Sequence, residues 1–244
     1  MPFSVPILAD APDTRFPDPA ACRHPDGLVA IGGGLERERL LAAYQNGIFP
    51  WYEPGGPILW WSPNPRIVIE PERFHSPRRL ARTWRQRRHR VTLDQAFEAV
   101  IDACAEPRDY ADGTWITPEM RTAYVDLHRA GHAHSVEIWH DDRLTGGLYG
   151  VALGRIFFAE SKFHRARDAS KLALVELMQV LKRHNFKLCD CQLWNRHLQQ
   201  FDVRMVERDA FLAQVRSSAT EPSAWPAGPS LLQPESGETN ERID

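Results

Sequence analysis

The sequence predicts a mixed α/β protein with a small N-terminal domain at 1–65, a larger domain at 66–216 and a disordered acidic tail at 217–244. Its 244 residues are 43% hydrophobic and 25% charged, the composition of a globular protein that can bury a sizeable core. Proline and aromatic residues crowd the first segment, and strand and helix patterns follow in the second. The last segment holds five acidic residues and one arginine, with too few large apolar side chains to offset the entropy of ordering.

Charge, cysteine content and hydropathy exclude several classes of protein. Lys and Arg number 30 against 32 Asp and Glu, so the chain as a whole is not a basic nucleic-acid-binding protein, although a local basic patch is compatible with this balance. The four cysteines form no C-x-x-C pair, which favours a reducing compartment. The sequence shows neither a signal-peptide pattern nor a run of 18 apolar residues. We therefore expect a soluble, cytoplasmic protein with no membrane segment.

The elements of the N-terminal part are few. Prolines between positions 50 and 65 fix φ and remove backbone donors, so this aromatic stretch is expected to be rigid and irregular. One helix is expected near 36–46. A short strand follows at 66–71, and a helix at 77–88 carries many arginines.

From residue 93 the pattern becomes mixed α and β. Apolar spacing predicts a first helix, and a second helix is entered from Thr117 and closed by Gly131. Alternating residues predict three consecutive strands, and a helix with a broad apolar face leads to a fourth. These elements are expected at 94–104, 118–131, 133–140, 143–153, 155–160, 168–184 and 186–193, with short helical pieces near 196 and at 208–215.

The most informative polar residues lie in the strand expected at 186–193. Successive side chains alternate along a strand, so Asp190 and Gln192 would share one face roughly 6 to 7 Å apart. A solvated edge strand explains these two residues at least as well as a functional site. Glu160, another carboxyl at the end of an apolar strand, favours the functional interpretation because a buried carboxylate is costly unless it is paired or used.

Two tryptophans lie in separate loops braced by glycine and proline, Trp51 in NGIFPWYEPGGP and Trp115 in GTWITP. A tryptophan can stack on a nucleobase with a free energy of about 1 to 3 kcal/mol. Filling the contact between two small domains explains loop tryptophans equally well.

An arginine-rich segment between residues 78 and 90 holds seven arginines and no acidic residue. Such an unbalanced local charge favours a polyanionic partner over a merely solvated helix face. By contrast, the histidines at 128, 132 and 134 lack an H-E-x-x-H motif, so no metal is expected.

The chain resembles the leucyl/phenylalanyl-tRNA protein transferase family, whose members move an amino acid from charged tRNA to the N-terminus of an acceptor protein. The resemblance covers about residues 3 to 215, and the tryptophan- and proline-rich stretch is its most specific part. The matching stretches are PDGLVAIGG (25–33), NGIFPWYEPGGPILWWSPNPR (46–66), GTWITPEM (113–120), AHSVEIW (133–139), GGLYGVALGRIFFAES (146–161), DASKLAL (168–174) and DCQ (190–192).

The resemblance implies an acetyltransferase-like (GNAT) fold for the C-terminal domain and no cofactor. It implies that Trp51 and Trp115 hold the 3′ adenosine of the tRNA, and that the basic helix grips the acceptor stem. The implied residues for the tRNA backbone are Arg78, Arg79, Arg82 and Arg85, and those for the donor side-chain pocket are Leu148, Phe157, Leu174 and Leu177.

The resemblance also implies how the reaction proceeds. The partners would be leucyl- or phenylalanyl-tRNA and a protein that begins with Arg or Lys, which the transfer marks for degradation by the N-end rule. Gln192 would lie beside the attacking amine with Asp190 behind it, orienting the amide, and Glu160 would contribute negative potential. Gln192 is a poor base, so the proton acceptor stays open.

The sequence departs from the family pattern where the family usually has G-E-S-M-F-S, because this chain reads AESKFH at 159–164. Lys162 therefore stands where the family has a methionine that lines the pocket. Its ammonium group must reach solvent, pair with a carboxylate or alter the choice of donor amino acid. The donors implied by the resemblance are leucine and phenylalanine, with methionine as a further candidate. Two alternatives stay open: an acetyl-CoA-dependent N-acetyltransferase, although the Q-x-x-G-x-G/A loop is missing, and a non-catalytic tRNA-binding module.

Overall fold

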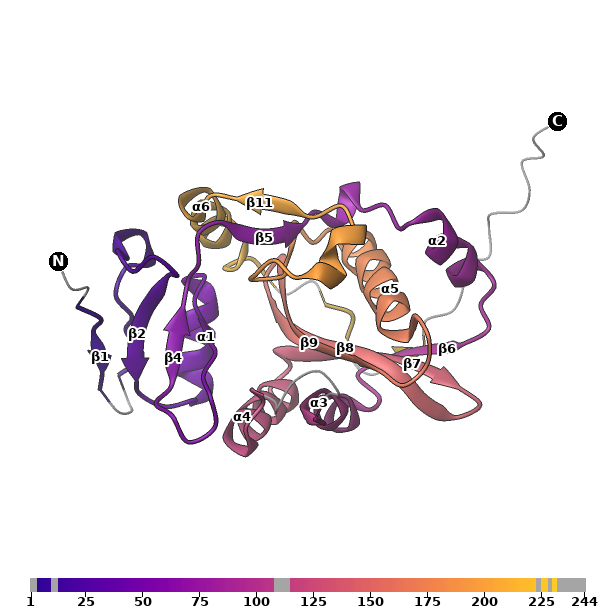
Figure 1. The fold of residues 1–244 in the computed structure, drawn as a ribbon, viewed down its shortest axis with the longest axis horizontal. Coiled ribbons are helices and arrows are strands. Elements are labelled where there is room, and N and C mark those ends of the chain that lie inside the picture. Colours follow the sequence, from indigo (N-terminus) through magenta and orange to yellow (C-terminus); the bar gives the residue numbers. More distant parts are fainter. Residues whose placement is uncertain (1–3, 10–12, 108–114, 223–224, 228–229, 232–244) are drawn as a thin grey trace.

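A computed structural model describes residues 4–9, 13–107, 115–222, 225–227 and 230–231. These residues form two β-sheets flanked by helices (Figure 1). The predicted mixed α/β class is confirmed. None of the helices in the described part of the chain is both long enough and apolar enough to cross a lipid bilayer.

The smaller sheet belongs to the N-terminal part. Its four strands lie in the order β1-β2-β4-β3, and α1 is the helix expected near 36–46. The chain leaves this sheet after β4 and enters the larger sheet at β5, so the predicted boundary at residue 65 falls in the connection. The elements are β1 (Ile7–Leu8), η1 (Pro19–Ala21), β2 (Leu28–Gly32), α1 (Arg37–Gln45), β3 (Phe49–Pro50) and β4 (Leu59–Trp61).

The larger sheet has eight strands in the order β11-β5-β10-β9-β8-β7-β6-β12. Strands β7, β8 and β9 are antiparallel neighbours, and α5 then crosses over to β10, which runs parallel to β9. This is the predicted order of three strands, a helix and a strand. The strands are β5 (Arg66–Ile69), β6 (Arg90–Leu93), β7 (Ala133–His140), β8 (Arg143–Leu153), β9 (Ile156–His164), β10 (Leu188–Asp190), β11 (Arg204–Val206) and β12 (Ser230–Leu231).

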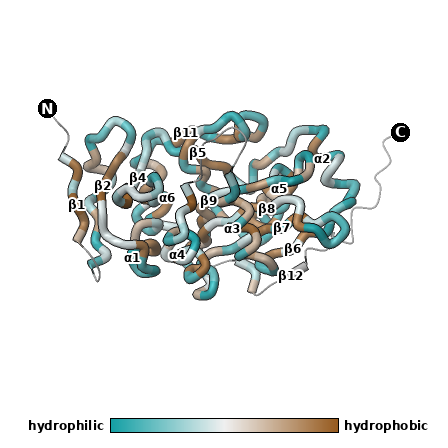
Figure 2. Tube along the Cα trace, turned by 60° about the horizontal axis from the view of Figure 1, so that its bottom comes forward, coloured by the Kyte–Doolittle hydropathy of each residue, from teal (hydrophilic) through white to brown (hydrophobic). Residues whose placement is uncertain are grey.

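Helices cover both faces of the larger sheet: α5 lies on one face, and α3 and α4 lie on the other (Figure 1). Alternation along β9 sends Phe157 to the α5 side and Phe158 to the opposite side, where it packs with α1 and α4. Hydrophobic colouring concentrates in the central strands, whereas the tube around α2 is largely hydrophilic (Figure 2). The helices are η2 (Pro71–Arg73), α2 (Arg78–Arg85), α3 (Phe97–Ala105), α4 (Pro118–Arg129), α5 (Ala169–Arg183), η3 (Arg196–Gln200) and α6 (Arg208–Ser218).

Local chemistry explains where α4 begins. The Thr117 hydroxyl accepts a hydrogen bond from the backbone N–H of Met120 at 3.2 Å, and Pro118 occupies the first helical position, where no donor is needed. The Thr117 start of this helix is therefore confirmed. It fixes the end of the loop that carries Trp115.

The prediction of a disordered tail is wrong for part of its range. Helix α6 continues to Ser218, and Trp225 is 8% exposed, with its ring stacked on those of His134 and Phe157 at 4.5 and 5.3 Å. Strand β12 pairs with β6. The prediction rests on the average composition of 28 residues, and this average does not reveal that one of them, Trp225, packs into the hydrophobic cluster beside Phe157. Residues 223–224, 228–229 and 232–244 of the predicted tail lie outside the described residues.

Candidate active site

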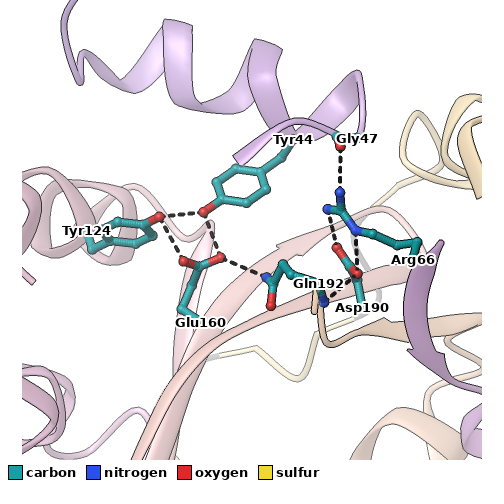
Figure 3. A network of polar contacts seen from close by, with 7 residues as sticks. All are labelled: Tyr44, Gly47, Arg66, Tyr124, Glu160, Asp190 and Gln192. Carbon is teal, nitrogen blue, oxygen red and sulfur yellow. Dashed lines mark hydrogen bonds and ion pairs between the residues drawn. The ribbon is translucent and has the colours of Figure 1, made fainter. Parts of the chain in front are cut away.

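Glu160 is the centre of a polar network between β9 and the N-terminal part (Figure 3). In the pairing of β8 with β9, Ala159 lies opposite Gly150 and Ser161 lies opposite Tyr149, so Glu160 is the extra residue of a β-bulge. Bulges bend a strand and redirect a side chain. The Glu160 carboxylate accepts hydrogen bonds from the hydroxyls of Tyr44 (2.8 Å) and Tyr124 (3.0 Å) and from the Gln192 amide (3.3 Å).

The hydroxyl groups of the two tyrosines contact each other as well as this carboxyl. Their hydroxyl oxygens lie 2.5 Å apart, so three oxygen–oxygen contacts connect Tyr44, Tyr124 and Glu160. Each hydroxyl carries a single hydrogen, and two hydrogens cannot fill three contacts when Glu160 is ionised. A proton on Glu160 would fill the third contact.

Electrostatics agree with this proton count. Burial raises the pKa of Glu160 to about 7, against the lowering effect of the hydrogen bonds from Tyr44 and Tyr124. Burial and the neighbouring Glu160 also raise the pKa of both tyrosines, so their hydroxyls stay protonated. Glu160 can therefore take up or release a proton near neutral pH.

Asp190 lies in a different environment. Its carboxylate accepts hydrogen bonds from Arg66 Nε (2.9 Å) and Nη2 (2.7 Å), and both side chains are fully buried. The Arg66 Nη1 group donates to the carbonyl of Gly47 at 3.0 Å. Glycine suits position 47, because φ is +67° there and a Cβ would lie 2.6 Å from a methyl group of Leu212. Asp190 therefore belongs to an ion pair that ties β10 to β5 and to the loop before β3.

The expectation that Asp190 and Gln192 share one strand face is wrong. Strand β10 ends at Asp190, and Gln192 has φ of +54°, so the strand alternation does not reach it. The Asp190 carboxylate accepts a hydrogen bond from the backbone N–H of Gln192 at 3.0 Å rather than from its side-chain amide. Such a bond between nearby residues stabilises a turn. The amide of Gln192 turns instead to Glu160.

A cavity of about 490 Å³ opens beside this network. Glu160 and Trp115 both line it, together with Lys162, Phe163, Asn195 and His197. The structure thus brings together two of the predicted site residues that lie far apart in sequence.

Trp51 lies in the neighbouring loop and does not line this cavity. Its side chain is 45% exposed, and its ring lies 6.3 Å from that of Trp61. The hydroxyls of Tyr52 and Thr117 approach to 3.2 Å, so the two loops that carry Trp51 and Trp115 are in contact.

The four residues predicted for the donor pocket lie in one hydrophobic cluster between α5 and the sheet. All are at most 4% exposed, and only Leu174 lines a described cavity. Trp225 stacks on Phe157, a contact that the sequence did not predict. A donor side chain could therefore reach this cluster only from the cavity that Leu174 lines. The four residues are Leu148, Phe157, Leu174 and Leu177.

The arginine-rich segment forms α2 and its flanks. Its four predicted phosphate contacts are exposed, but the expectation that no acid offsets the segment is wrong, because Arg87 pairs with Glu176 of α5 at 2.5 Å. The Trp84 indole donates to the same carboxylate at 2.8 Å. These contacts fix α2 on α5 and leave one face free. The exposed arginines are Arg78, Arg79, Arg82 and Arg85.

Sequence reasoning missed three residues of the network: Tyr44, Tyr124 and Arg66. Both tyrosines occupy apolar-face positions of predicted helices, where a tyrosine is ordinary core, and 80 residues separate them. A charged residue opening the apolar run RIVI was the available signal for Arg66.

Comparison with known proteins identifies the class of protein first. The family model described as "Leucyl/phenylalanyl-tRNA protein transferase" matches residues 68–216, and the model of its N-terminal domain matches residues 33–64. The chain therefore belongs to the leucyl/phenylalanyl-tRNA protein transferase family. It is an enzyme, so the alternative of a non-catalytic tRNA-binding module is wrong.

Several curated relatives bear the name leucyl/phenylalanyl-tRNA–protein transferase. The protein from Stutzerimonas stutzeri is 52% identical over 87% of this chain and 94% of its own length. The one from Pseudomonas syringae pv. syringae is 54% identical over 78% of this chain and 83% of its own length. Among solved structures, that of L-PGS from Bacillus licheniformis gives a TM-score of 0.38 at 12% identity, over 68% of this chain and 53% of that one, a similarity too low to carry an argument.

Proposed function

We propose that this enzyme transfers leucine or phenylalanine from charged tRNA to the N-terminal Arg or Lys of acceptor proteins in the cytoplasm, marking them for degradation by the N-end rule. The observation that carries the proposal is the cavity lined by both Trp115 and Glu160. An aromatic ring for a nucleobase and a titratable carboxyl for an amine then border one space.

The terminal adenosine of the tRNA would bind between the two tryptophan loops. Trp115 would hold the base at the edge of the cavity, and exposed Trp51 would close over it from the neighbouring loop. The contact between Tyr52 and Thr117 supports this arrangement because it keeps the two loops together. The exposed arginines of α2 would bind phosphates of the acceptor stem.

The chemical step needs a neutral amine. The α-amino group of the acceptor attacks the ester carbonyl, a C–N bond forms, and the C–O bond to the ribose breaks with a proton passing to the ribose oxygen. Before that, the ammonium form of the acceptor must lose a proton. We assign this proton to ionised Glu160, because its pKa near 7 suits a general base at neutral pH.

Gln192 and Asp190 would help to position the attacking amine and would not accept its proton. The amide of Gln192 donates to Glu160, and its carbonyl oxygen would accept a hydrogen bond from the attacking amine. Asp190, held by Arg66, would fix the turn from which the Gln192 side chain projects. The negative charge of ionised Glu160 would also favour an acceptor that begins with a cationic residue.

A direct assay tests the proposal. The protein is incubated with leucyl- or phenylalanyl-tRNA and two peptides that differ only in a first residue of Arg or Glu, and products are followed by mass. We expect extension of the Arg peptide by one leucine or phenylalanine and little extension of the Glu peptide. Equal extension of both peptides would contradict the assigned acceptor, and no extension with either donor would contradict the function.

A further inference from the structure

Glu176 lies where the arginine-rich helix α2 packs beside α5 (Figure 1). It is only 2% exposed, although it carries a carboxyl group. Its Oε1 atom accepts a hydrogen bond from the Trp84 indole at 2.8 Å and pairs with the Arg87 guanidinium at 2.5 Å. That guanidinium also lies over the Trp84 ring, 4.2 Å from the ring centroid. One buried carboxylate of α5 therefore holds two residues at the C-terminal end of α2.

This contact determines which face of α2 meets solvent. Leu80 and Trp84 are four residues apart, so they share one face of the helix, and both pack into the hydrophobic cluster that contains α5. Arg78, Arg82 and Arg85 lie on the opposite face, and all three are exposed. The orientation of the exposed arginines thus follows from the way the other face is docked.

Helix α5 also borders the candidate active site. Ser170, near its N-terminal end, lines the cavity that Glu160 and Trp115 line. Through Glu176, α2 is therefore attached to a helix that reaches this cavity. The attachment matters because α2 has only eight residues, and a helix of that length depends on packing for its stability.

We propose that Glu176 is a positioning residue for tRNA binding, which holds the exposed arginines of α2 at a fixed place relative to the active site, so that one tRNA molecule can contact both. The inference rests on the proposed function and goes beyond it, because Glu176 is buried and would itself contact no phosphate. Without this carboxylate, the Trp84 N–H and Arg87 lose their shared acceptor and α2 is free to shift. Phosphate contacts that depend on the position of α2 then weaken.

Electrostatics alone predicts the opposite effect. Glu176 is a negative charge beneath a basic helix, so removing it without any movement of α2 would raise the positive potential and strengthen the binding of a polyanion. A positioning role predicts weaker binding in spite of that gain. The direction of the change in tRNA affinity therefore distinguishes the two roles.

Two variants test the inference without altering any arginine. Glu176→Leu removes the acceptor of both contacts, and Trp84→Phe removes only the indole N–H. Transfer is measured from phenylalanyl-tRNA and from phenylalanyl-adenosine, which has no acceptor stem. For Glu176→Leu we expect the KM for the tRNA to rise about fivefold, with kcat and the use of phenylalanyl-adenosine nearly unchanged. Trp84→Phe should give a smaller rise.

A salt titration and a charge-matched control complete the test. In Glu176→Leu the slope of log tRNA affinity against log salt should become shallower by about 0.9, the value for one phosphate contact. Glu72→Gln is the control, because Glu72 precedes α2 and pairs with Lys182 of α5 at 3.4 Å, but is exposed. It removes the same charge from a pair that fixes little, so the KM for tRNA should stay the same or fall.

The outcomes separate this inference from the proposed function. If the unaltered enzyme fails to transfer from charged tRNA, the proposed function is wrong. If it transfers but Glu176→Leu binds tRNA as tightly as the unaltered enzyme, or more tightly, the positioning role is wrong. If Glu176→Leu loses activity with both donors in equal proportion, Glu176 supports the fold in general, which also contradicts the inference.

Discussion

Two carboxyl groups on neighbouring strands of one sheet have opposite surroundings. Asp190 ends β10 and lies in a bidentate, fully buried ion pair with Arg66. Glu160 projects from the bulge of β9 and receives its hydrogen bonds from uncharged donors, two tyrosines and an amide. The guanidinium of Arg66 fixes the Asp190 carboxylate in place, whereas burial raises the pKa of Glu160 to about 7, so that this group can exchange a proton near neutral pH. Both side chains are carboxyls, so the comparison shows that the groups around each carboxyl decide whether its role is structural or chemical.

The largest expected effect is on stability, at the ion pair. Arg66→Met should lower the free energy of unfolding by about 3 to 5 kcal/mol, because it leaves the buried Asp190 carboxylate without its cation. Denaturant unfolding measures this loss. The double substitution Arg66→Met/Asp190→Leu removes both charges and should recover part of it. If the Arg66→Met protein were as stable as the unaltered protein, the structural role assigned to the ion pair of Asp190 would be wrong.

The second effect is on rate, at Glu160. Glu160→Gln should lower kcat/KM by about 10² to 10⁴ while the affinity for tRNA stays nearly unchanged, because the amide cannot accept the proton of the ammonium group. In the unaltered enzyme the rate should rise as pH increases from 5.5 to above 7. The variant should lose this rise and keep only the titration of the acceptor amine near pH 8.

Stability should respond to the same ionisation with a defined sign. Because the pKa of Glu160 is about 7 in the folded protein and near 4.5 when unfolded, folding favours its protonated form. The stability of the unaltered protein relative to Glu160→Gln should thus be greatest below pH 4.5 and decline as pH rises through 7. If this relative stability instead increased as the pH rises, folding would favour the ionised form of Glu160, contrary to the prediction.

The smallest effect sharpens the comparison at the tyrosines. Tyr44→Phe or Tyr124→Phe removes a hydrogen bond that lowers the pKa of Glu160, so the midpoint of the pH–rate profile should move up by about one pH unit, with rates within a few-fold at pH 8.5. Tyr149→Phe is the matched control, since its buried hydroxyl has no hydrogen-bond partner among the described residues. A midpoint that moves equally in all three variants would indicate a general loss of packing.

The sequence predicted the elements of the larger sheet well because each follows a local rule. Thr117 caps its helix, and period-two alternation marks β7 and β8. The same rule failed at the site. It assumed an unbroken alternation through Asp190 and Gln192, but the chain leaves the strand there, and a bulge interrupts β9 at Glu160.

Partners at long range could not be predicted in the same way. Tyr44 and Tyr124 meet Glu160 only because α1 and α4 pack on one side of the sheet, and no local pattern encodes that meeting. Trp115 and Glu160 could be proposed as candidates from the sequence because one is an aromatic residue in a loop braced by glycine and proline and the other is a carboxyl at the end of an apolar strand, and the structure places both at one cavity. The sequence alone could not identify Tyr44 and Tyr124 as the groups whose hydrogen bonds affect the pKa of Glu160.

The return of the chain after α6 has a consequence for how the enzyme is handled. Residues 230 and 231 occupy the outer side of β6, and Trp225 is anchored by a hydrogen bond from its indole N–H to Asp94 at 2.9 Å. An enzyme shortened after Ser218 would present the main-chain donors and acceptors of β6 to other molecules, which invites strand-to-strand association. Poor solubility of such a shortened protein would then reflect an unprotected sheet margin, with its catalytic groups unchanged.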